Sequence, residues 1–445
     1  MKKPATIIRI IYLIIALFMT SSGYSQTAEE YFNKGMEKYN LQDYMGSFAD
    51  YTKAIEINPK FAEAYYNRGL AELGIEDYNG AIADFTKAIG LNPKNAKAYC
   101  GRGYAKDDLQ DYRGGIADFT KAIELEPKYA MAYNNRGLAK IVLQDKMGAI
   151  ADFTKAIELE PKYVDAYYNR GHAKDDLQDY RGAIADYTKA IELDPNDVEA
   201  YDNRGNAKVD LKDYNGAIAD YTKAIELDPK YAKAYFNRGD AKDDLQDYSG
   251  GIADFTKAID LDPKFVVAYY NRGLAKYNLQ DCMGAIADYT KAIELDPKHG
   301  DAYYNRGLAK IYLNDNRGAI PDFNKAIEID PAFADAYCNR GHAKDDLQDY
   351  RGGIADYTKA IELDPKFVVA YYNRGIAKYR LHDNIGAIAD YTKAIELNPE
   401  YAEAYYNRGV AKIGSSQKDS GCMDLIKARD LGDSLANEVI KKYCQ

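Results

Sequence analysis

Two stretches of helical apolar spacing, separated by a turn, recur along most of the chain. In one copy, AYYNRGLAKYNL at residues 268–279 has the spacing of one amphipathic helix, and GAIADYTKAIEL at residues 284–295 has that of a second. Gln280 and Asp281 lie between them and mark a turn, while Asp-Pro-Lys at residues 296–298 marks the link to the next copy. The pattern therefore predicts a series of helical hairpins.

Proline marks the period of this pattern. From Pro59 to Pro399 it recurs every 34 residues, with no insertion or deletion. We number each copy so that this proline is position 32; the last copy lacks the proline. Twelve copies then begin at Ala28, Ala62, Ala96, Ala130, Val164, Val198, Ala232, Val266, Gly300, Ala334, Val368 and Ala402. One hairpin of this size cannot bury its own apolar face, so we expect the copies to stack.

Small residues recur where two helices would approach closely. Every copy has Gly at position 8 and Ala at position 27, and position 20 is Ala, Gly or Ser. Aspartate at position 16 can cap the second helix, and the proline at position 32 ends it. Pro321, inside the second helix of the ninth copy, removes a backbone hydrogen bond, so we expect a kink or a late start there.

The 34-residue period, the small residues at positions 8, 20 and 27, an aromatic residue at position 24 and the proline at position 32 together resemble the tetratricopeptide repeat family. The resemblance covers about residues 28–435. The resemblance implies an all-α fold: a right-handed superhelical solenoid of about twelve helix-turn-helix repeats. Two positions depart from the family pattern. Position 4 is Tyr instead of Trp, and position 7 is Arg instead of Leu, with Lys34 in the first copy. The interior of each hairpin must therefore differ from that of a typical member.

The two ends of the chain differ from the repeats. Lys2, Lys3 and Arg9 are followed by an apolar run from Ile10 to Met19 and then by small, polar residues, which is the plan of a secretory signal peptide. The run is too short to span a bilayer comfortably. We expect a signal peptide at residues 1–25, cleaved after Ser25, and a solenoid at residues 26–435.

At the other end, Leu435, Val439 and Ile440 have the spacing of a capping helix, whose C-terminal part is residues 436–445. Cys422 and Cys444 are equally distant from the turn near residue 433, so an antiparallel helix pair would bring them level. We expect these two to form a disulfide, and Cys100, Cys282 and Cys338 to be unpaired.

Arginine at position 7 has an expected partner within its own repeat. Positions 7 and 23 are equidistant from the turn at position 15, so an antiparallel hairpin places them side by side, and position 23 is Asp in every copy. We therefore expect ion pairs such as Arg68 with Asp84, Arg272 with Asp288 and Arg408 with Asp424. The interpretation is that this arginine holds the hairpin together.

Asparagine at position 6 is found in eleven copies, with Gly101 in the third. Asparagine is unfavourable inside a helix, so its recurrence at this position needs an explanation. In tetratricopeptide proteins that bind extended peptides, a similar Asn holds the ligand backbone in a concave groove. That resemblance implies a groove ladder of Asn67, Asn135, Asn169, Asn203, Asn237, Asn271, Asn305, Asn339 and Asn373. Alternatively, each Asn bonds the neighbouring repeat, and both roles can hold at once.

Other positions expected in the groove vary. At position 5, tyrosines alternate with other residues, and we count Tyr66, Tyr168, Tyr270, Tyr304 and Tyr372 as groove candidates. Positions 12 and 13 form acidic pairs that begin at Asp107, Asp175, Asp243 and Asp345. If they face inward, they make an acidic lining that favours a basic partner segment. Otherwise they form a solvated surface, partly neutralised by Lys at position 11.

Composition and residue spacing give no sign of catalysis. Lys and Arg number 59 against 69 Asp and Glu, which leaves no basic excess for binding nucleic acid. His172 and His342 share a repeat position but lie five copies apart, so they cannot meet at one metal. No histidine stands at a plausible distance from a Ser or Cys nucleophile. We expect no enzyme activity, no metal site and no cofactor.

The sequence thus predicts an exported scaffold that binds extended protein segments. The N-terminal segment and the repeats resemble bacterial proteins, which suggests the periplasm or the cell surface. A carbohydrate-binding solenoid, with tyrosine rings stacking on sugars, is an alternative, and a purely structural spacer is another. Salt separates the first two, because protein binding steered by acidic residues weakens as salt rises, whereas stacking on a neutral glycan does not.

Overall fold

The computed structural model describes residues 26–444, which form helices α2 to α26 and contain no strand. The expected signal peptide lies outside these residues. The helices are α2 (Ala28–Asn40), α3 (Tyr44–Ile57), α4 (Ala62–Gly74), α5 (Tyr78–Leu91), α6 (Ala96–Asp108), α7 (Tyr112–Leu125), α8 (Ala130–Val142), α9 (Lys146–Leu159), α10 (Val164–Asp175), α11 (Tyr180–Leu193), α12 (Val198–Asp210), α13 (Tyr214–Leu227), α14 (Ala232–Asp244), α15 (Tyr248–Leu261), α16 (Val266–Asn278), α17 (Cys282–Leu295), α18 (Gly300–Tyr312), α19 (Asn316–Ile329), α20 (Ala334–Asp346), α21 (Tyr350–Leu363), α22 (Val368–Arg380), α23 (Asn384–Leu397), α24 (Ala402–Gly414), α25 (Lys418–Asp430) and α26 (Ala436–Tyr443).

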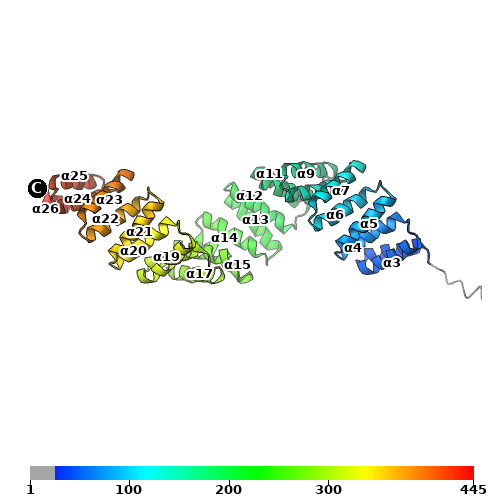
Figure 1. Ribbon diagram of the computed structural model, residues 1–445, viewed down its shortest axis with the longest axis horizontal. Helices are drawn as coiled ribbons and strands as arrows, with labels where there is room; N and C mark the ends of the chain where they lie inside the picture. The colour runs from blue at the N-terminus through cyan, green and yellow to red at the C-terminus, as the bar shows by residue number, and fades with distance from the viewer. Residues whose placement is uncertain (1–25, 445) are drawn as a thin grey trace, which may run out of the picture. The chain divides into compact units, whose positions relative to one another are not determined.

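The chain is an all-α solenoid of helical hairpins, as predicted. It divides into two compact units, one ending at Asp213 and the other beginning at Tyr214. We call the first helix of each hairpin the A helix (α2, α4 and so on to α24) and the second the B helix. Within each unit, an A helix packs against the B helix that follows it, and that B helix packs against the next A helix (Figure 1).

Local residue chemistry sets the ends of the B helices. In α17, the carboxylate of Asp281 accepts a hydrogen bond of 2.9 Å from the amide of Gly284 and caps the helix, as predicted for position 16. The residue before it, Gln280, has a φ of 63° and closes the turn. At the other end, Asp296 is extended and precedes Pro297, which cannot continue the helix.

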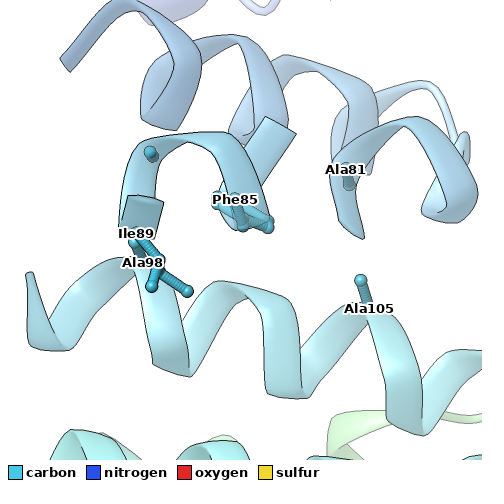
Figure 2. Close-up of a cluster of buried hydrophobic side chains, with 6 residues drawn as sticks. Ala81, Phe85, Ile89, Ala98 and Ala105 are labelled. Atoms are coloured by element: carbon cyan, nitrogen blue, oxygen red, sulfur yellow. The ribbon is translucent and has the colours of Figure 1, made fainter. Parts of the chain in front are cut away.

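The core of each hairpin but the last, where Leu425 takes this place, is a buried aromatic ring packed against glycine. Phe85 at position 24 is fully buried, and a Cβ atom on Gly69 at position 8 would lie 2.8 Å from its ring. Ala81 and Ala88 of α5 are also fully buried. Figure 2 shows Phe85 and Ile89 of α5 lying over α6, so the same residues pack the next repeat. The small residues therefore allow close packing both within and between repeats.

Two expectations about helix ends need correction. A late start at Pro321 is wrong, because α19 begins at Asn316, the same repeat position as the other B helices, and includes Pro321. The kink, the other alternative, stays a prediction. Proline there removes only the hydrogen bond to the carbonyl of Arg317, in the first turn. Leu435 is 61% exposed and precedes α26, whereas Ala436 is fully buried. The capping helix α26 does pack on α25, but not through Leu435.

A disulfide fastens the C-terminal helix. Cys422 of α25 and Cys444 at the end of α26 are bridged, with Cα atoms 5.7 Å apart, in line with the expectation from their spacing. Cys100, Cys282 and Cys338 are buried free thiols, also as expected. The bridge closes a loop that contains the whole of α26, so the helix cannot separate far from α25.

Replacing both Cys422 and Cys444 by serine should destabilise the docking of α26. The disulfide joins residues that are 22 apart in the sequence, and its removal gives the unfolded chain more conformational freedom. The free energy of unfolding should fall by about 3 kcal/mol as a result. Amide hydrogen exchange should become faster in α26 and in the end of α25, while the amides of α22 serve as an internal control. Unchanged protection of α26 in the double variant would contradict this prediction.

Candidate binding surface on the A helices

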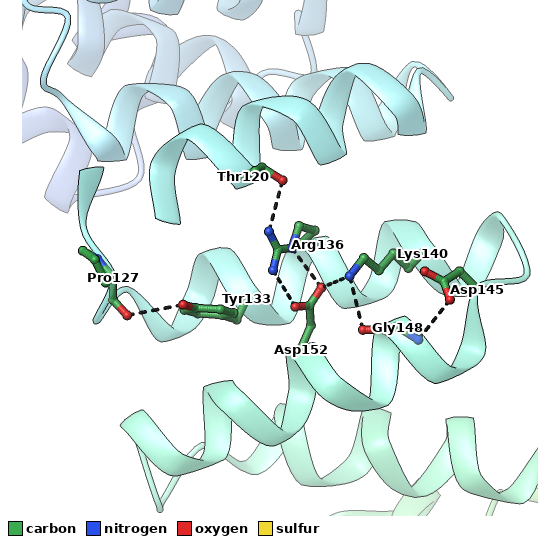
Figure 3. A network of polar contacts seen from close by, with 8 residues as sticks. All are labelled: Thr120, Pro127, Tyr133, Arg136, Lys140, Asp145, Gly148 and Asp152. Atoms are coloured by element: carbon green, nitrogen blue, oxygen red, sulfur yellow. Dashed lines mark hydrogen bonds and ion pairs between the residues drawn. The ribbon is translucent and has the colours of Figure 1, made fainter. Parts of the chain in front are cut away.

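Arginine at position 7 is part of the scaffold. Arg136 of α8 donates two hydrogen bonds to Asp152 of α9, of 2.9 and 2.6 Å, and a third, of 3.1 Å, to Thr120 of the preceding repeat (Figure 3). Lys140 reaches the same carboxylate at 2.6 Å. The guanidinium carbon lies 5.5 Å from the ring centre of Tyr133. The predicted ion pair is thus confirmed, and it also ties neighbouring repeats together.

The two hydrogen bonds from arginine to aspartate recur in both units. Arg68, Arg102 and Arg170 form them in the first unit, and Arg238, Arg272, Arg306, Arg340, Arg374 and Arg408 in the second. In each case the aspartate side chain is nearly inaccessible, for example 5% exposed for Asp288. These guanidinium groups have few donors left for a ligand.

Asparagine at position 6 bonds the neighbouring repeat in several copies. The amide of Asn305 donates to the hydroxyl of Tyr270, at position 5 of the preceding repeat, over 2.9 Å. The same contact joins Asn203 to Tyr168, Asn339 to Tyr304 and Asn407 to Tyr372. Inter-repeat bonding, one of the two roles expected for this residue, is therefore present. Each amide keeps its carbonyl oxygen, so these contacts leave a role in binding open.

The remaining candidate asparagines vary in their contacts. Asn169 donates to Asn134 over 3.0 Å, and Asn271 donates to Asp240 over 2.9 Å. Asn67 bonds the carbonyl of Glu63 in its own helix. The others lie on the same face of their A helices: Asn135 accepts from Asn134 and lies beside the Cys100 thiol, Asn373 lies beside the Cys338 thiol, and Asn237 is partly exposed.

The candidate tyrosines at position 5 are half-buried. The ring of Tyr304 packs on Phe323 of its own hairpin with centres 5.9 Å apart, and burial raises the pKa of its hydroxyl to about 12. Tyr66, Tyr168, Tyr270 and Tyr372 make the equivalent ring contact, and burial raises their pKa values as well. One face of each ring is therefore used by the core, which leaves less of it to stack on a sugar.

The acidic lining expected if positions 12 and 13 face inward stays a prediction, and the structure shows a packing role for position 12 in the third repeat. A Cβ atom on Gly115 at position 20 would overlap the carboxylate of Asp107, so this side chain fills the space left by that glycine. One carboxylate oxygen each of Asp107, Asp175, Asp243 and Asp345 is buried without a hydrogen-bond partner. Desolvation, followed by the nearby charge of Asp108, raises the pKa of Asp107 to about 7. Asp108, Asp176, Asp244 and Asp346 are exposed, whereas the first residue of each pair is partly buried.

Two adjoining pockets lie on the A helices of repeats two to four, within the first unit. The first, which we call the Cys100 pocket, has a volume of about 550 Å³ and is lined by Tyr66, Leu70, Leu73, Lys97, Cys100, Gly101, Tyr104, Tyr129, Met131 and Asn135. The second, the Asp107 pocket, has about 350 Å³ and is lined by Tyr104, Asp107, Asp108, Tyr112, Asn135, Leu138, Ala139, Ile141 and Val142. Tyr104 and Asn135 belong to both.

These pockets were not predicted, although the sequence contains a signal for them. Gly101 is the one residue at position 6 that is not Asn, and Cys100 stands where six copies have Tyr. Both residues line the Cys100 pocket, and a Cβ atom on Gly101 would lie 2.7 Å from the ring of Phe85. Gly101 also leaves the hydroxyl of Tyr66 without the asparagine partner that Tyr168, Tyr270, Tyr304 and Tyr372 have.

Within residues 26–444 we find no group of His, Cys, Asp or Glu arranged to hold a metal ion. His172 and His342 lie on A helices of different units, and the nearest acidic partner of His342 is Asp346, at 3.8 Å. Over the same residues, every helix is too short or too polar to cross a bilayer.

Comparison with solved structures gives several tetratricopeptide proteins. YrrB, described as a TPR protein with an unusual peptide-binding site, is 27% identical over 41% of this chain and 95% of its own, with a TM-score of 0.38. MamA is 28% identical over 39% of this chain and 94% of its own, with a TM-score of 0.36. A protein from Parabacteroides merdae is 22% identical over 56% of this chain and 99% of its own, with a TM-score of 0.42. No curated protein sequence matches the chain.

Family models match nearly every repeat. A model described as "TPR repeat" matches residues 35–74, 205–242 and 383–413. Models described as "Tetratricopeptide repeat" match residues 62–95, 96–129, 130–163, 164–197, 186–219, 232–265, 266–299, 300–333 and 334–367. Together they cover residues 35–367 without a gap. With its hairpins, buried aromatic rings and close-packed glycines, the chain therefore belongs to the tetratricopeptide repeat family.

Proposed function

We propose that this protein is a non-enzymatic scaffold that binds extended protein segments on its A helices and acts in the envelope of a bacterium. Membership of the tetratricopeptide family supports a protein-interaction scaffold in general. The observation that carries the finer proposal is the pair of adjoining pockets on α4, α6 and α8. Elsewhere on the A helices, many of the residues at positions 6 and 7 are bonded within the scaffold.

The pocket walls favour a protein segment over a carbohydrate. Leu70, Leu73 and Met131 present apolar surface to the Cys100 pocket, and apolar groups offer no hydrogen bonds to sugar hydroxyls. A structural spacer would not need a pocket of this size, and Gly101, where the other copies have asparagine, is part of its lining. The position of the pockets, across three successive A helices, suits an elongated ligand.

The export part of the proposal rests on the composition of residues 1–25 and agrees with the disulfide between Cys422 and Cys444, since such bonds persist in oxidising compartments. Sequencing the N-terminus of the protein recovered from periplasmic and cytoplasmic fractions tests it. We expect a periplasmic chain that begins at Gln26. A chain recovered only from the cytoplasm with residues 1–25 intact would reject export.

Site-specific photocrosslinking tests the binding surface. A photoreactive amino acid would replace Met131 on the A helix α8 or, as a control, Lys155 on the B helix α9; both side chains are nearly half exposed. Crosslinked proteins would then be isolated from cells that express each variant. We expect specific protein adducts from position 131 and few from position 155. Equal adducts at both positions would contradict binding on the A helices.

A further inference from the structure

The Cys100 and Asp107 pockets differ in chemistry, although they share Tyr104 and Asn135. The first is walled by Tyr66, Leu70, Leu73 and Met131. The second has an apolar wall of Leu138 and Val142, but two carboxylates, Asp107 and Asp108, stand at its edge. Adjacent pockets of unlike chemistry distinguish between ligands by the order of their side chains.

From this juxtaposition we propose that repeats two to four form a recognition site for an extended peptide segment that places a bulky apolar side chain in the Cys100 pocket and a Lys or Arg side chain in the Asp107 pocket. The inference rests on the proposed function and specifies its ligand. It assigns the specificity of the protein to the copy in which Cys100 and Gly101 replace the common tyrosine and asparagine.

The apolar part of the site is accessible and unoccupied by the protein's own side chains. Met131 is 49% exposed, Leu138 is 41% exposed and Tyr104 is 48% exposed, so this face presents neighbouring large apolar residues on α6 and α8 to solvent. Contact with an apolar side chain would remove this surface from water, which is the main favourable term in such binding. The flexible Met131 side chain can adapt to ligands of different shape.

Polar groups of the site can hold a peptide backbone. Within the described residues the hydroxyl of Tyr66 makes no hydrogen bond, because Gly101 replaces its usual asparagine partner. The amide of Asn135 lies between the two pockets. An extended segment has unpaired backbone N–H and C=O groups, so it can bond both. A purely apolar small molecule would leave these groups unpaired.

Charge is distributed unevenly along α6. Lys97 lies at its beginning and the pair Asp107 and Asp108 at its end, about 15 Å away by the helical rise. A cationic side chain beside Asp108 would gain attraction and would also meet the ring of Tyr104, whereas the same side chain beside Lys97 would be repelled. The surface therefore favours one direction of the ligand chain over the other.

A positional-scanning library of N-acetylated nonapeptides, screened against residues 26–445, tests the proposal. We expect selection of Leu, Met or an aromatic residue at one position and of Lys or Arg at another. The selected peptides would then be measured by fluorescence polarisation against Met131→Glu/Leu138→Asp. Both replacements occur naturally at the same repeat positions, as Glu63 and Asp240, so the fold should tolerate them.

A matched control carries the same changes in repeat eight, Val267→Glu/Leu274→Asp. We expect the repeat-four variant to bind at least about tenfold more weakly and the repeat-eight variant to bind as the unchanged protein does. Asp108→Lys should abolish the preference for Lys or Arg while keeping the apolar preference, and Asp346→Lys, at the same position in repeat ten, should change neither.

The possible results test the proposed site and the proposed function separately. Loss of binding in the repeat-four variant alone, with the altered preference in Asp108→Lys, supports the proposal. If selected peptides bind the repeat-four variant as well as they bind the unchanged protein, the site is wrong, but peptide binding by the protein stands. If no peptide is retained by the unchanged protein, both the site and the proposed binding of extended segments are rejected.

Discussion

Replacing Arg272 by leucine is expected to destabilise the surrounding repeats by about 3–5 kcal/mol, because it leaves the buried carboxylate of Asp288 without its main partner. Arg272 donates hydrogen bonds of 3.0 and 2.6 Å to Asp288 and one of 3.0 Å to Thr256. Lys276, at 2.7 Å, would remain as the only cation on that carboxylate. Urea denaturation and hydrogen exchange in α16 and α17 measure the loss.

Thr256→Val provides the control, since it leaves the pair with Asp288 intact. It removes the bond from Arg272 and the bond of 2.7 Å that the Thr256 hydroxyl donates to the carbonyl of Ile252 in its own helix. We expect it to cost about 1–2 kcal/mol, the typical value of two hydrogen bonds. If Arg272→Leu costs no more than Thr256→Val, the pairing with Asp288 adds little and the arginine would have to be explained by binding. Hydrogen exchange is needed beside the global measurement, because long repeat arrays need not unfold in one step.

The pairing of Arg272 with Asp288 could be predicted because it depends only on hairpin symmetry. Positions 7 and 23 are equally far from the turn, and any antiparallel hairpin with that turn places them together. The bond from Arg272 to Thr256 could not be predicted in this way. It joins two repeats, and its geometry depends on how one hairpin stacks on the next, which the spacing within a repeat does not specify.

The orientation of the side chain at position 12 could not be predicted from the sequence of one helix alone. Asp107, Asp243 and Asp345 appear to belong to charged pairs on a surface, but whether a side chain faces the solvent or the partner helix depends on the residue opposite. In these three repeats position 20 is the glycine Gly115, Gly251 or Gly353. The carboxylates of Asp107 and Asp345 lie where a Cβ atom on the glycine opposite would overlap them, and this coincidence of aspartate with glycine was in the sequence.

The Cys100 pocket was missed for a similar reason. A ladder of asparagines draws attention to what the copies share, whereas the hollow is produced by the copy that breaks the pattern at Cys100 and Gly101. In a repeat protein the common positions are largely explained by stacking. Departures from them are therefore the better guide to binding.

The buried acids lead to the second large effect, a loss of stability at alkaline pH. Desolvation is the main cause of three raised pKa values. It raises the pKa of Glu72 to about 8, that of Asp345 to about 7 and that of Asp243 to about 6. Folding thus favours the protonated form of each group. This contribution to stability is complete below the unfolded pKa values, near 4, and is lost as the pH rises through about 6 to 8.

We therefore expect urea to unfold the protein more readily at pH 9 than at pH 5. Partial solvent screening limits each group to about 2 kcal/mol, so the variant Glu72→Gln/Asp107→Asn should remove about 4 kcal/mol of the pH dependence of the first unit. The control is Asp108→Asn, because the carboxylate of Asp108 is less buried than that of Asp107 and should contribute less to the pH dependence.

Equal stability of the unchanged protein at the two pH values would show that the carboxylates of Glu72 and of the aspartates at position 12 reach water when they are charged. In that case the glycines at position 20 would be accommodating a solvated side chain, and the inward orientation of position 12 would have to be given up.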